Sequence, residues 1–265
     1  MQFATWNVNS LTVRLPQVID WLAANPVDVL GLQELKLSDD KFPLQAFMDV
    51  GYKASFFGQK TYNGVALLTK SDAINIVKNI PSFTDEQSRV IAATVPSSLG
   101  DIRVVNAYFV NGHAPGTDKF EYKMSWLRAM RDYLRSELEA NPRVVVMGDF
   151  NITLDDADSW DPDGLRETIH HTTQERDQLK ALLALGLHDT HRMLLDTIPA
   201  IKADKHFSWW DYRDFGFKRN RGLRIDYVLA SDALKPNVAS CVIDKTPRKN
   251  ERPSDHTPVV MTLGT

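Results

Sequence analysis

Short apolar runs rich in β-branched and aromatic residues recur along the whole chain, and they constrain its fold more than any other feature. Most of these runs are bounded by Gly, Pro, Asn or Asp, which commonly flank strands. The predicted strands are FATWNV, VDVLGLQ, GVALLT, VIAATV, IRVVNAYF, RVVVMGDF, RIDYVLA and PVVMTL. Because the runs are continuous rather than alternating, they indicate strands that are buried on both faces.

Helical patterns separate only some of the predicted strands. The predicted helices are RLPQVIDWLAANP, with Pro16 in its first turn, the segment 118–141, and ERDQLKALLALG, which ends at Gly186. Several strands follow one another without a helix, which fits poorly with the regular alternation of a doubly wound sheet. We therefore expect a layered α/β arrangement, in which two sheets pack face to face with helices outside.

The composition of the 265-residue chain, 43% hydrophobic and 25% charged, is that of an ordinary soluble protein. This length suits one large domain as well as two small ones. No segment resembles a linker or a low-complexity tract, so we expect residues 1–265 to form a single domain. The stretches 153–173 and 206–224 are predicted to be exposed loops, and long loops in compact domains usually carry function.

The chain carries no sequence feature of a secreted or membrane protein. Cys241 is the single cysteine and cannot form an internal disulfide. The start, MQFATWNVNS, lacks the basic and apolar regions of a signal peptide, and no apolar run approaches membrane-spanning length. We expect a cytoplasmic protein without membrane association, and a monomer without an obligate protein partner, because no heptad repeat indicates an oligomer.

The net charge of -3 argues against a generally basic nucleic-acid-binding protein. Local basic runs nevertheless occur at KRNRGLR, which holds Lys218, Arg219 and Arg221, and at KTPRKNER. Each run by itself is typical of a solvated loop. Acidic residues that bind cations would leave the working surface more positive than the formal charge, so nucleic-acid binding stays open.

Polar side chains end most of the predicted strands. They are Asn7 and Asn9, Glu34, Asn106 and Tyr108, Asp149 and Asn151, Asp226, and Asp255 with His256. Any one of them is typical of a strand that ends in a side-chain turn. Their repetition indicates that the ends of neighbouring strands converge on one rim, where a site can be built.

The donor atoms of this rim predict its chemistry. Carboxylate and amide oxygens, with one imidazole and no cysteine, suit Mg²⁺ or Mn²⁺ better than a structural zinc ion. Mg²⁺ usually takes one or two protein carboxylates and shares its other positions with water and phosphate oxygens, and Glu34 is the first candidate. The remaining acids would orient a water molecule, and the set predicts metal-assisted hydrolysis of a phosphodiester or a phosphomonoester.

Taken in order, several motifs closely resemble the exonuclease III branch of the endonuclease/exonuclease/phosphatase superfamily. They are TWNVNSLTVRL, LQELKL, NAYFVNG, GDFN, GLRIDYVLAS and PSDHTPV. The resemblance implies the four-layered α/β sandwich shared with DNase I, with two packed mixed sheets flanked by helices. GLRIDY and FSWWDYR resemble the abasic-site DNA repair enzymes more than the inositol phosphatases or sphingomyelinases of the superfamily.

The function implied by the resemblance is that of a Mg²⁺-dependent DNA repair phosphodiesterase, with Mn²⁺ as an alternative ion. Such an enzyme cleaves double-stranded DNA 5′ to abasic sites and cleans blocked 3′ ends as phosphodiesterase, phosphatase and 3′-to-5′ exonuclease. Three alternatives stay open: a specialised DNA 3′-phosphatase, a small-molecule or lipid phosphoesterase, and a binding module that has lost its activity.

The resemblance also assigns roles to the residues at the rim. Glu34 becomes the principal Mg²⁺ ligand, with Asn7 and Asp255 beside the metal. Asp149 would orient and deprotonate the attacking water, helped by Asn151. The roles of general base and metal ligand can be exchanged among these carboxylates, because coupled carboxylates around a metal titrate together.

On the substrate side, His256 would lie against the scissile phosphate and be held in its tautomer by Asp226. Tyr108 would donate to the phosphate or stabilise the leaving oxygen. The residues expected to bind DNA or the lesion are Asn9, Asn111, Trp209, Leu223, Ile225, Lys218, Arg219, Arg221 and His170. Among these, the aromatic and aliphatic side chains would line a pocket for a base-less deoxyribose, and the cations would contact the DNA backbone.

The loop DDADSWDPDGLRETIHHTTQER departs from the family pattern, because it carries the adjacent histidines His170 and His171 near the expected DNA groove. The simpler interpretation is two surface histidines at a helix start. A more specific hypothesis is that the imidazole of His170 narrows the space for continuous DNA. Substrates with a free 3′ end would then be favoured over internal abasic sites, and some members of this branch are similar in acting mainly as 3′-phosphatases.

Overall fold

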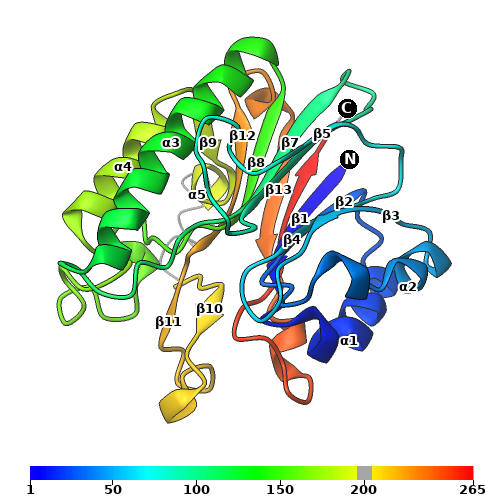
Figure 1. Cartoon of the computed structure of the whole chain (residues 1–265). Coiled ribbons are helices and arrows are strands. Elements are labelled where there is room, and N and C mark those ends of the chain that lie inside the picture. The colour runs from blue at the N-terminus through cyan, green and yellow to red at the C-terminus, as the bar shows by residue number, and fades with distance from the viewer. Residues whose placement is uncertain (196–204, 265) are drawn as a thin grey trace.

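The computed structural model describes residues 1–195 and 205–264, and two six-stranded sheets make up its centre (Figure 1). The first sheet has the order β13 (Val238–Ile243), β14 (Val259–Leu263), β1 (Gln2–Asn7), β2 (Val29–Gln33), β4 (Val65–Thr69) and β3 (Lys53–Phe57). β1 and β2 are parallel, and the other pairs are antiparallel, so the sheet is mixed.

The second sheet repeats this design. Its order is β5 (Ile74–Lys78), β6 (Val90–Val95), β7 (Ile102–Tyr108), β8 (Val144–Asp149), β12 (Asp226–Ser231) and β9 (Leu187–Asp189). Only β7 and β8 run parallel. Each sheet therefore has one parallel pair at its centre, and the carboxyl ends of these central strands lie at the same end of the sandwich (Figure 1).

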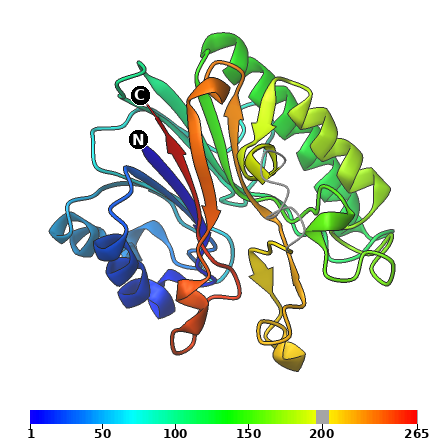
Figure 2. The ribbon, with the colours of Figure 1, turned by 180° about the vertical axis from the view of Figure 1, so that it is seen from behind.

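Helices cover the outer face of each sheet, as the two opposite views show (Figures 1 and 2). α1 (Leu11–Ala24) and α2 (Leu44–Asp49) pack on the first sheet, and α3 (Asp118–Ala140) and α4 (Thr173–Leu183) pack on the second. The short α5 (Thr190–Leu195) contacts β12 and β13. Short 3-10 helices lie at Asp39–Lys41, Asp156–Asp158, Arg213–Phe215, Lys235–Asn237 and Thr246–Lys249.

The apolar core has three layers, which follow from the continuous apolar runs. The middle layer joins the inner faces of both sheets and includes Phe3, Val104 and Met147, each with no exposed surface. Burying side chains of this size stabilises the fold by about 1.5–3 kcal/mol each. The layered α/β fold class predicted from the sequence is confirmed.

One of the polar residues predicted for the rim, Asn106, lies in the core instead. Its side chain is fully buried, and Nδ2 donates to the carbonyls of Leu32 (3.0 Å) and Ala66 (2.9 Å) in the opposite sheet. Its Oδ1 accepts from Gln33 Nε2 at 2.6 Å. A Cβ on Gly31 would lie 2.6 Å from this oxygen, so Gly31 leaves the space that the amide fills. Asn106 thus joins the two sheets and lies away from the rim predicted for it.

Every predicted strand and helix is present, with two corrections. α1 begins at Leu11, so Pro16 lies inside the helix and not in its first turn. The predicted loop 206–224 contains a two-stranded ribbon, β10 (Trp209–Trp210) and β11 (Gly222–Leu223). Strands β3, β5, β9 and β13 and the short helices α2 and α5 are also additional. The strands gave no continuous apolar signal, because their sequences mix polar and apolar residues. Within the described part of the chain, no helix is long and apolar enough to cross a membrane.

Candidate active site

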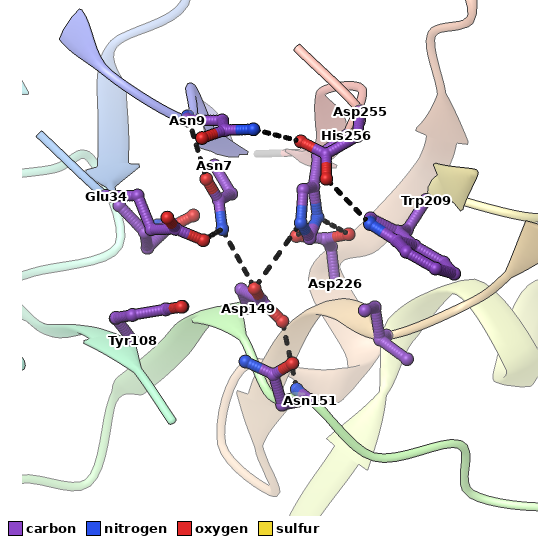
Figure 3. Close-up of polar contacts among 12 residues, drawn as sticks. Asn7, Asn9, Glu34, Tyr108, Asp149, Asn151, Trp209, Asp226, Asp255 and His256 are labelled. Carbon is purple, nitrogen blue, oxygen red and sulfur yellow. Dashed lines mark hydrogen bonds and ion pairs between the residues drawn. The ribbon is translucent and has the colours of Figure 1, made fainter. Parts of the chain in front are cut away.

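The polar residues predicted for the rim, apart from Asn106, meet at one end of the sandwich (Figure 3). β1, β7 and β8 end there at Asn7, Tyr108 and Asp149. β12 begins there at Asp226, and His256 lies in the turn before β14. The topology explains the convergence, because these strands are neighbours within the two sheets and the sheets face each other.

Asn7 lies at the centre of the cluster and joins the two sheets. Its Nδ2 donates to Glu34 Oε1 and to Asp149 Oδ2, both at 2.9 Å. The backbone N–H of Asn9 donates to Asn7 Oδ1 at 2.9 Å, which fixes the orientation of the amide. A single buried side chain therefore sets the distance between two carboxylates from different sheets.

Glu34, Asp149 and His256 form a group that could hold a metal ion, since each offers a ligand atom within 4.8 Å of the others. Glu34 has a left-handed backbone (φ 53°), an uncommon conformation for a residue with a side chain. The ammonium group of Lys36 lies 2.9 Å from Glu34 Oε2, so a cation of the protein already contacts this carboxylate. The group thus includes one of the three predicted metal ligands.

The other two predicted ligands have different partners. Asn7 lies next to Glu34 but commits its amide to the two carboxylates. Asp255 uses its two carboxylate oxygens to accept from Asn9 Nδ2 (2.9 Å) and from the indole Nε1 of Trp209 (3.0 Å), as Figure 3 shows. Asp255 therefore fixes the neighbouring loop and the β10–β11 ribbon against the rim.

Asp149 is held at both oxygens and almost completely buried. Oδ1 accepts from the backbone N–H of Asn151 at 2.9 Å, and Oδ2 accepts from Asn7. Burial raises the pKa of Asp149 to about 7, and the nearby acids Asp226 and Glu34 add to this effect, while His256 opposes it. A carboxylate with a pKa near neutrality can both lose and accept a proton under ordinary conditions.

His256 lies between two carboxylates. Its Nδ1 is 2.9 Å from Oδ2 and 3.1 Å from Oδ1 of Asp226, and its Nε2 is 3.6 Å from Oδ2 of Asp149. Since an ionised carboxylate only accepts, Nδ1 carries a proton. Burial alone would lower the pKa of His256, but Asp226 and Asp149 outweigh burial and raise it to about 10. The imidazole is therefore a cation at neutral pH.

The hydroxyl of Tyr108 points into the same space, below Glu34 and beside Asp149 (Figure 3). Burial raises the pKa of Tyr108 well above its usual value, and the charges of Glu34 and Asp149 add to this shift. The hydroxyl therefore remains protonated and can act as a hydrogen-bond donor. The guanidinium of Arg89 lies over the Tyr108 ring, 5.1 Å from its centre.

The ribbon β10–β11 places the predicted lesion residues beside His256. Trp209 pairs with Leu223 across the ribbon, and its ring centre is 6.5 Å from that of His256. Leu223 and Ile225 are only 3% and 2% exposed, so Trp209 supplies most of the apolar surface here. Between them, buried Arg224 pairs with Asp158 (2.6 Å) and with Asp189 (2.7 Å), which ties the segment to two other elements.

The ribbon ends in a basic arm that projects from the rim (Figures 1 and 2). Lys218, Arg219 and Arg221 are exposed on this arm. The guanidinium of Arg221 lies 4.9 Å from the centre of the Trp160 ring. Cations on a projecting arm next to a carboxylate-lined site are suited to bind a polyanion.

His170 and Asn111 meet at Asn151, on the other side of Asp149. Asn111 Nδ2 donates to Asn151 Oδ1 at 3.2 Å, and His170 Nδ1 donates to the backbone carbonyl of Asn151 at 2.6 Å. His170 is half-buried, and burial together with Lys123 lowers its pKa to about 3, so the imidazole is neutral. His171 is buried instead and bonds Ser159 Oγ at 3.0 Å. The two adjacent histidines therefore have different environments.

A family model described as "Endonuclease/Exonuclease/phosphatase family" matches residues 4–256, which include every residue of this rim. The chain belongs to this family. Exodeoxyribonuclease III of Haemophilus influenzae is 35% identical over 98% of both chains. The match covers nearly the whole chain, as the motifs of the sequence analysis do.

Solved structures of the family resemble the whole chain. The 3′-phosphatase NExo from Neisseria, bound to a product DNA hairpin, is 43% identical with a TM-score of 0.94, and the match covers 100% of both chains. An AP endonuclease from Archaeoglobus fulgidus is 32% identical with a TM-score of 0.92, again over 100% of both chains. Both have the two-sheet architecture described above.

Sequence reasoning missed two cationic side chains of this family member. Lys36 contacts Glu34 and also donates to Asn9 Oδ1 at 2.5 Å, although it stands within the motif LQELKL. Arg89 lines a hollow of about 530 Å³ beside Tyr108, and no motif points to it. The first could have been found from its position two residues after Glu34. The second could not, because its partner lies on the neighbouring strand.

Proposed function

We propose that the protein hydrolyses phosphate esters in DNA with the help of a bound divalent metal ion, as an exonuclease III-type repair enzyme. The observation that carries the proposal is the single cluster of Asn7, Glu34, Asp149 and His256, in which Asn7 joins the two carboxylates and the cationic imidazole lies 3.6 Å from Asp149 Oδ2. The names of the relatives, an exodeoxyribonuclease III and an AP endonuclease, support DNA as the substrate class.

The donor atoms fit Mg²⁺, with Mn²⁺ as the alternative. Glu34 would be the main ligand, and Asp149 offers further carboxylate oxygens in the same cluster, without a thiolate. Protonated His256 has no free ring nitrogen and would face the phosphate instead. The ammonium group of Lys36, 2.9 Å from Glu34 Oε2, would compete with the ion for this carboxylate. When bound, such an ion would stabilise negative charge on the phosphate. Asn7 and Asp255 would orient groups around the ion.

Asp149 would act as the proton acceptor for the attacking water. Its two oxygens are fixed by Asn7 and by the N–H of Asn151, so the remaining lone pairs have a defined direction. Its raised pKa matches the requirement of a general base that works near neutral pH. Asn151 contacts both the carboxylate of Asp149 and the loop of Asn111.

His256 and Tyr108 would bind the phosphate from the other sides. Protonated His256 keeps its Nδ1–H on Asp226 and directs Nε2–H into the site, toward negative charge. The Tyr108 hydroxyl would donate to a phosphate oxygen or to the leaving oxygen. Because both donors are preorganised in a buried site, each would stabilise developing charge more than it could in water.

Binding of the DNA would use the ribbon and its arm. The exposed face of Trp209, with Leu223 and Ile225 beneath, would contact the sugar next to the cleaved bond. The cations Lys218, Arg219 and Arg221 would contact backbone phosphates. Asn9 and Asn111, at either edge of the carboxylate cluster, would contact the strand near the scissile phosphate.

A second, narrower function is favoured by His170, namely a preference for 3′ ends over internal abasic sites. The imidazole is fixed on the carbonyl of Asn151, the residue whose backbone N–H holds the proton acceptor Asp149. A bulky ring at this place would restrict a DNA strand that continues past the site more than a DNA strand that ends there. The 43% identical 3′-phosphatase from Neisseria supports this preference.

Three labelled duplexes test both proposals, each with Mg²⁺, with Mn²⁺ and with EDTA. The first carries an internal abasic analogue, the second a 3′-phosphate at a nick, and the third an undamaged recessed 3′ end. Cleavage only with metal supports the general proposal. Removal of the 3′-phosphate with little abasic incision supports the narrower one, and no reaction with any duplex would refute both.

We further propose that residues 1–265 act as one domain and as a cytoplasmic monomer. The apolar layer between the sheets takes residues from both halves of the chain, such as Phe3 and Met261, which supports cooperative folding. A single unfolding transition and a sedimentation mass of one chain are expected.

A further inference from the structure

A fully buried lysine lies behind the site and contacts two of its loops. Lys123 on α3 has no exposed side-chain surface. Its ammonium group donates to the backbone carbonyls of Asn111 (3.1 Å) and Asn151 (2.8 Å). Gly112 makes room for it, since a Cβ there would lie 2.8 Å from Lys123 Cδ. A charged group inside the protein is costly unless it is paired, so these contacts need a counter-charge.

Glu175 on α4 supplies this counter-charge and is equally buried. One oxygen, Oε1, pairs with Lys123 Nζ and also accepts from the backbone N–H of His170 at 3.1 Å. The other, Oε2, accepts from the N–H and the hydroxyl of Thr172 at 3.1 and 2.8 Å. The ion pair therefore reaches three loops, those of Asn111, Asn151 and His170.

His170 needs such support, because its backbone is in the left-handed region (φ 71°). A residue with a side chain in this region stores strain unless the surroundings hold it there. Its N–H donates to Glu175 and its Nδ1 to the Asn151 carbonyl, while its own carbonyl accepts from the N–H (2.9 Å) and the hydroxyl (2.8 Å) of Thr153. Glu175 makes the first of these bonds itself, and Lys123 positions the Asn151 carbonyl that accepts the second.

We propose that the buried Lys123–Glu175 pair determines substrate preference, by holding His170 in the position that restricts continuous DNA. This inference rests on the narrower function proposed above. Neither residue touches substrate; Lys123 and Glu175 are positioning residues that act through His170. Loss of the pair would free the N–H of His170, let its imidazole shift and relax the preference, while Glu34 and Asp149 keep their hydrogen bonds to Asn7.

The test compares kcat/KM for the nicked 3′-phosphate duplex with kcat/KM for the internal abasic duplex. In Glu175→Gln the amide has one acceptor oxygen where the carboxylate had two, so it cannot hold both His170 and Thr172. The ratio should shift toward abasic incision by about tenfold, the scale expected when a positioning interaction is removed. General destabilisation would lower both reactions together and leave the ratio unchanged.

Two further variants keep the test decisive. Breaking one half of a buried ion pair is strongly destabilising, whereas removing both charges is often tolerated. K123M/E175Q should therefore fold better than E175Q and show the same shift in ratio. The matched control is Glu137→Gln, which breaks the Arg103–Glu137 pair (2.9 Å) at the other end of α3 and should leave the ratio as in the wild type.

A double-mutant cycle tests whether the effect of Glu175→Gln on the substrate ratio requires His170. Glu175→Gln should have no further effect on the ratio when it is added to His170→Gly. An unchanged ratio in both E175Q and K123M/E175Q, or an equal shift with and without His170, would overturn the inference. If the wild type removes no 3′-phosphate at all, the proposed function fails instead, and the two failures are thereby distinguished.

Discussion

Asp226 and His256 come from different sheets, and their pairing at 2.9 Å between Oδ2 and Nδ1 joins β12 to the turn before β14. Because Asp226 offsets the effect of burial, its replacement by Asn should lower the pKa of His256 from about 10. Loss of a neighbouring opposite charge shifts a pKa by about 1–3 units. Activity that needs the imidazolium should then decline at a pH lower by about this amount.

The measurement is a pH profile of kcat/KM for Asp226→Asn against the wild type, with the 3′-phosphate duplex. The sign follows from the charge requirement: the imidazolium is lost as pH rises through its pKa, so the alkaline limb moves to lower pH. Asp232→Asn, at an exposed carboxylate elsewhere on the surface, is the matched control. An alkaline limb that coincides in Asp226→Asn and the wild type would contradict the role of His256.

A second prediction concerns Glu34. Loss of an outer-shell group typically lowers metal affinity by about 10–100-fold, so removal of the main ligand in Glu34→Gln should lower it at least that much. Activity should require correspondingly more Mg²⁺, measured by titration of the rate with the metal. Lys36→Met should act in the opposite direction, because the ammonium 2.9 Å from Glu34 Oε2 competes with the ion. Equal Mg²⁺ requirements in all three proteins would exclude Glu34 as the ligand.

The sequence predicted the central strands and the rim, and failed where partners lie far apart in the chain. β2 and β8 are buried at every position, so their apolar runs were unambiguous. Exposed edge strands such as β5 have no comparable signal. The polar residues at strand ends predicted the site, because the topology brings the ends of neighbouring strands to one edge of the sandwich. The pairing of Lys123 with Glu175, 52 positions apart, leaves no trace in spacing or periodicity.

A third prediction concerns the basic arm. Lys218→Ala/Arg219→Ala should weaken DNA binding and reduce the slope of log K against log[salt] by about 1 for each phosphate that the arm no longer binds. Binding is measured between about 50 and 200 mM salt, the range over which such interactions weaken strongly. The control Arg128→Ala/Arg135→Ala removes two exposed cations from the outer face of α3. If both double variants have the same slope, the arm does not bind the DNA backbone.

A fourth prediction concerns stability in acid. Burial, followed by the charge of Arg224, lowers the pKa of His191 from 6.5 to about 4. The unfolded chain therefore binds a proton that the folded chain does not, and stability falls as pH drops from about 6.5 toward 4. One pKa unit is about 1.4 kcal/mol, so the loss at this residue amounts to about 3 kcal/mol. His191→Phe should lose less stability between pH 7 and pH 5, measured by urea unfolding, and an identical loss would contradict the assignment.

The last prediction concerns His170 itself. Gly tolerates the left-handed backbone (φ 71°) that strains His170, so His170→Gly recovers about 1 kcal/mol of strain and loses one hydrogen bond of similar size. Overall stability should change little. Removal of the ring should raise incision of the internal abasic duplex relative to 3′-phosphate removal by about tenfold, because the space beside Asn151 opens to a continuous strand.

His171→Gly is the matched control for this prediction. His171 is 3% exposed and bonds Ser159 and the carbonyl of Ile169, away from Asn151. Its removal should lower the unfolding temperature without changing the substrate ratio. A rise in abasic incision in both variants would mean that loosening of the loop suffices. No rise in His170→Gly would show that the imidazole does not restrict the DNA, and the preference would then have to come from the ribbon around Trp209.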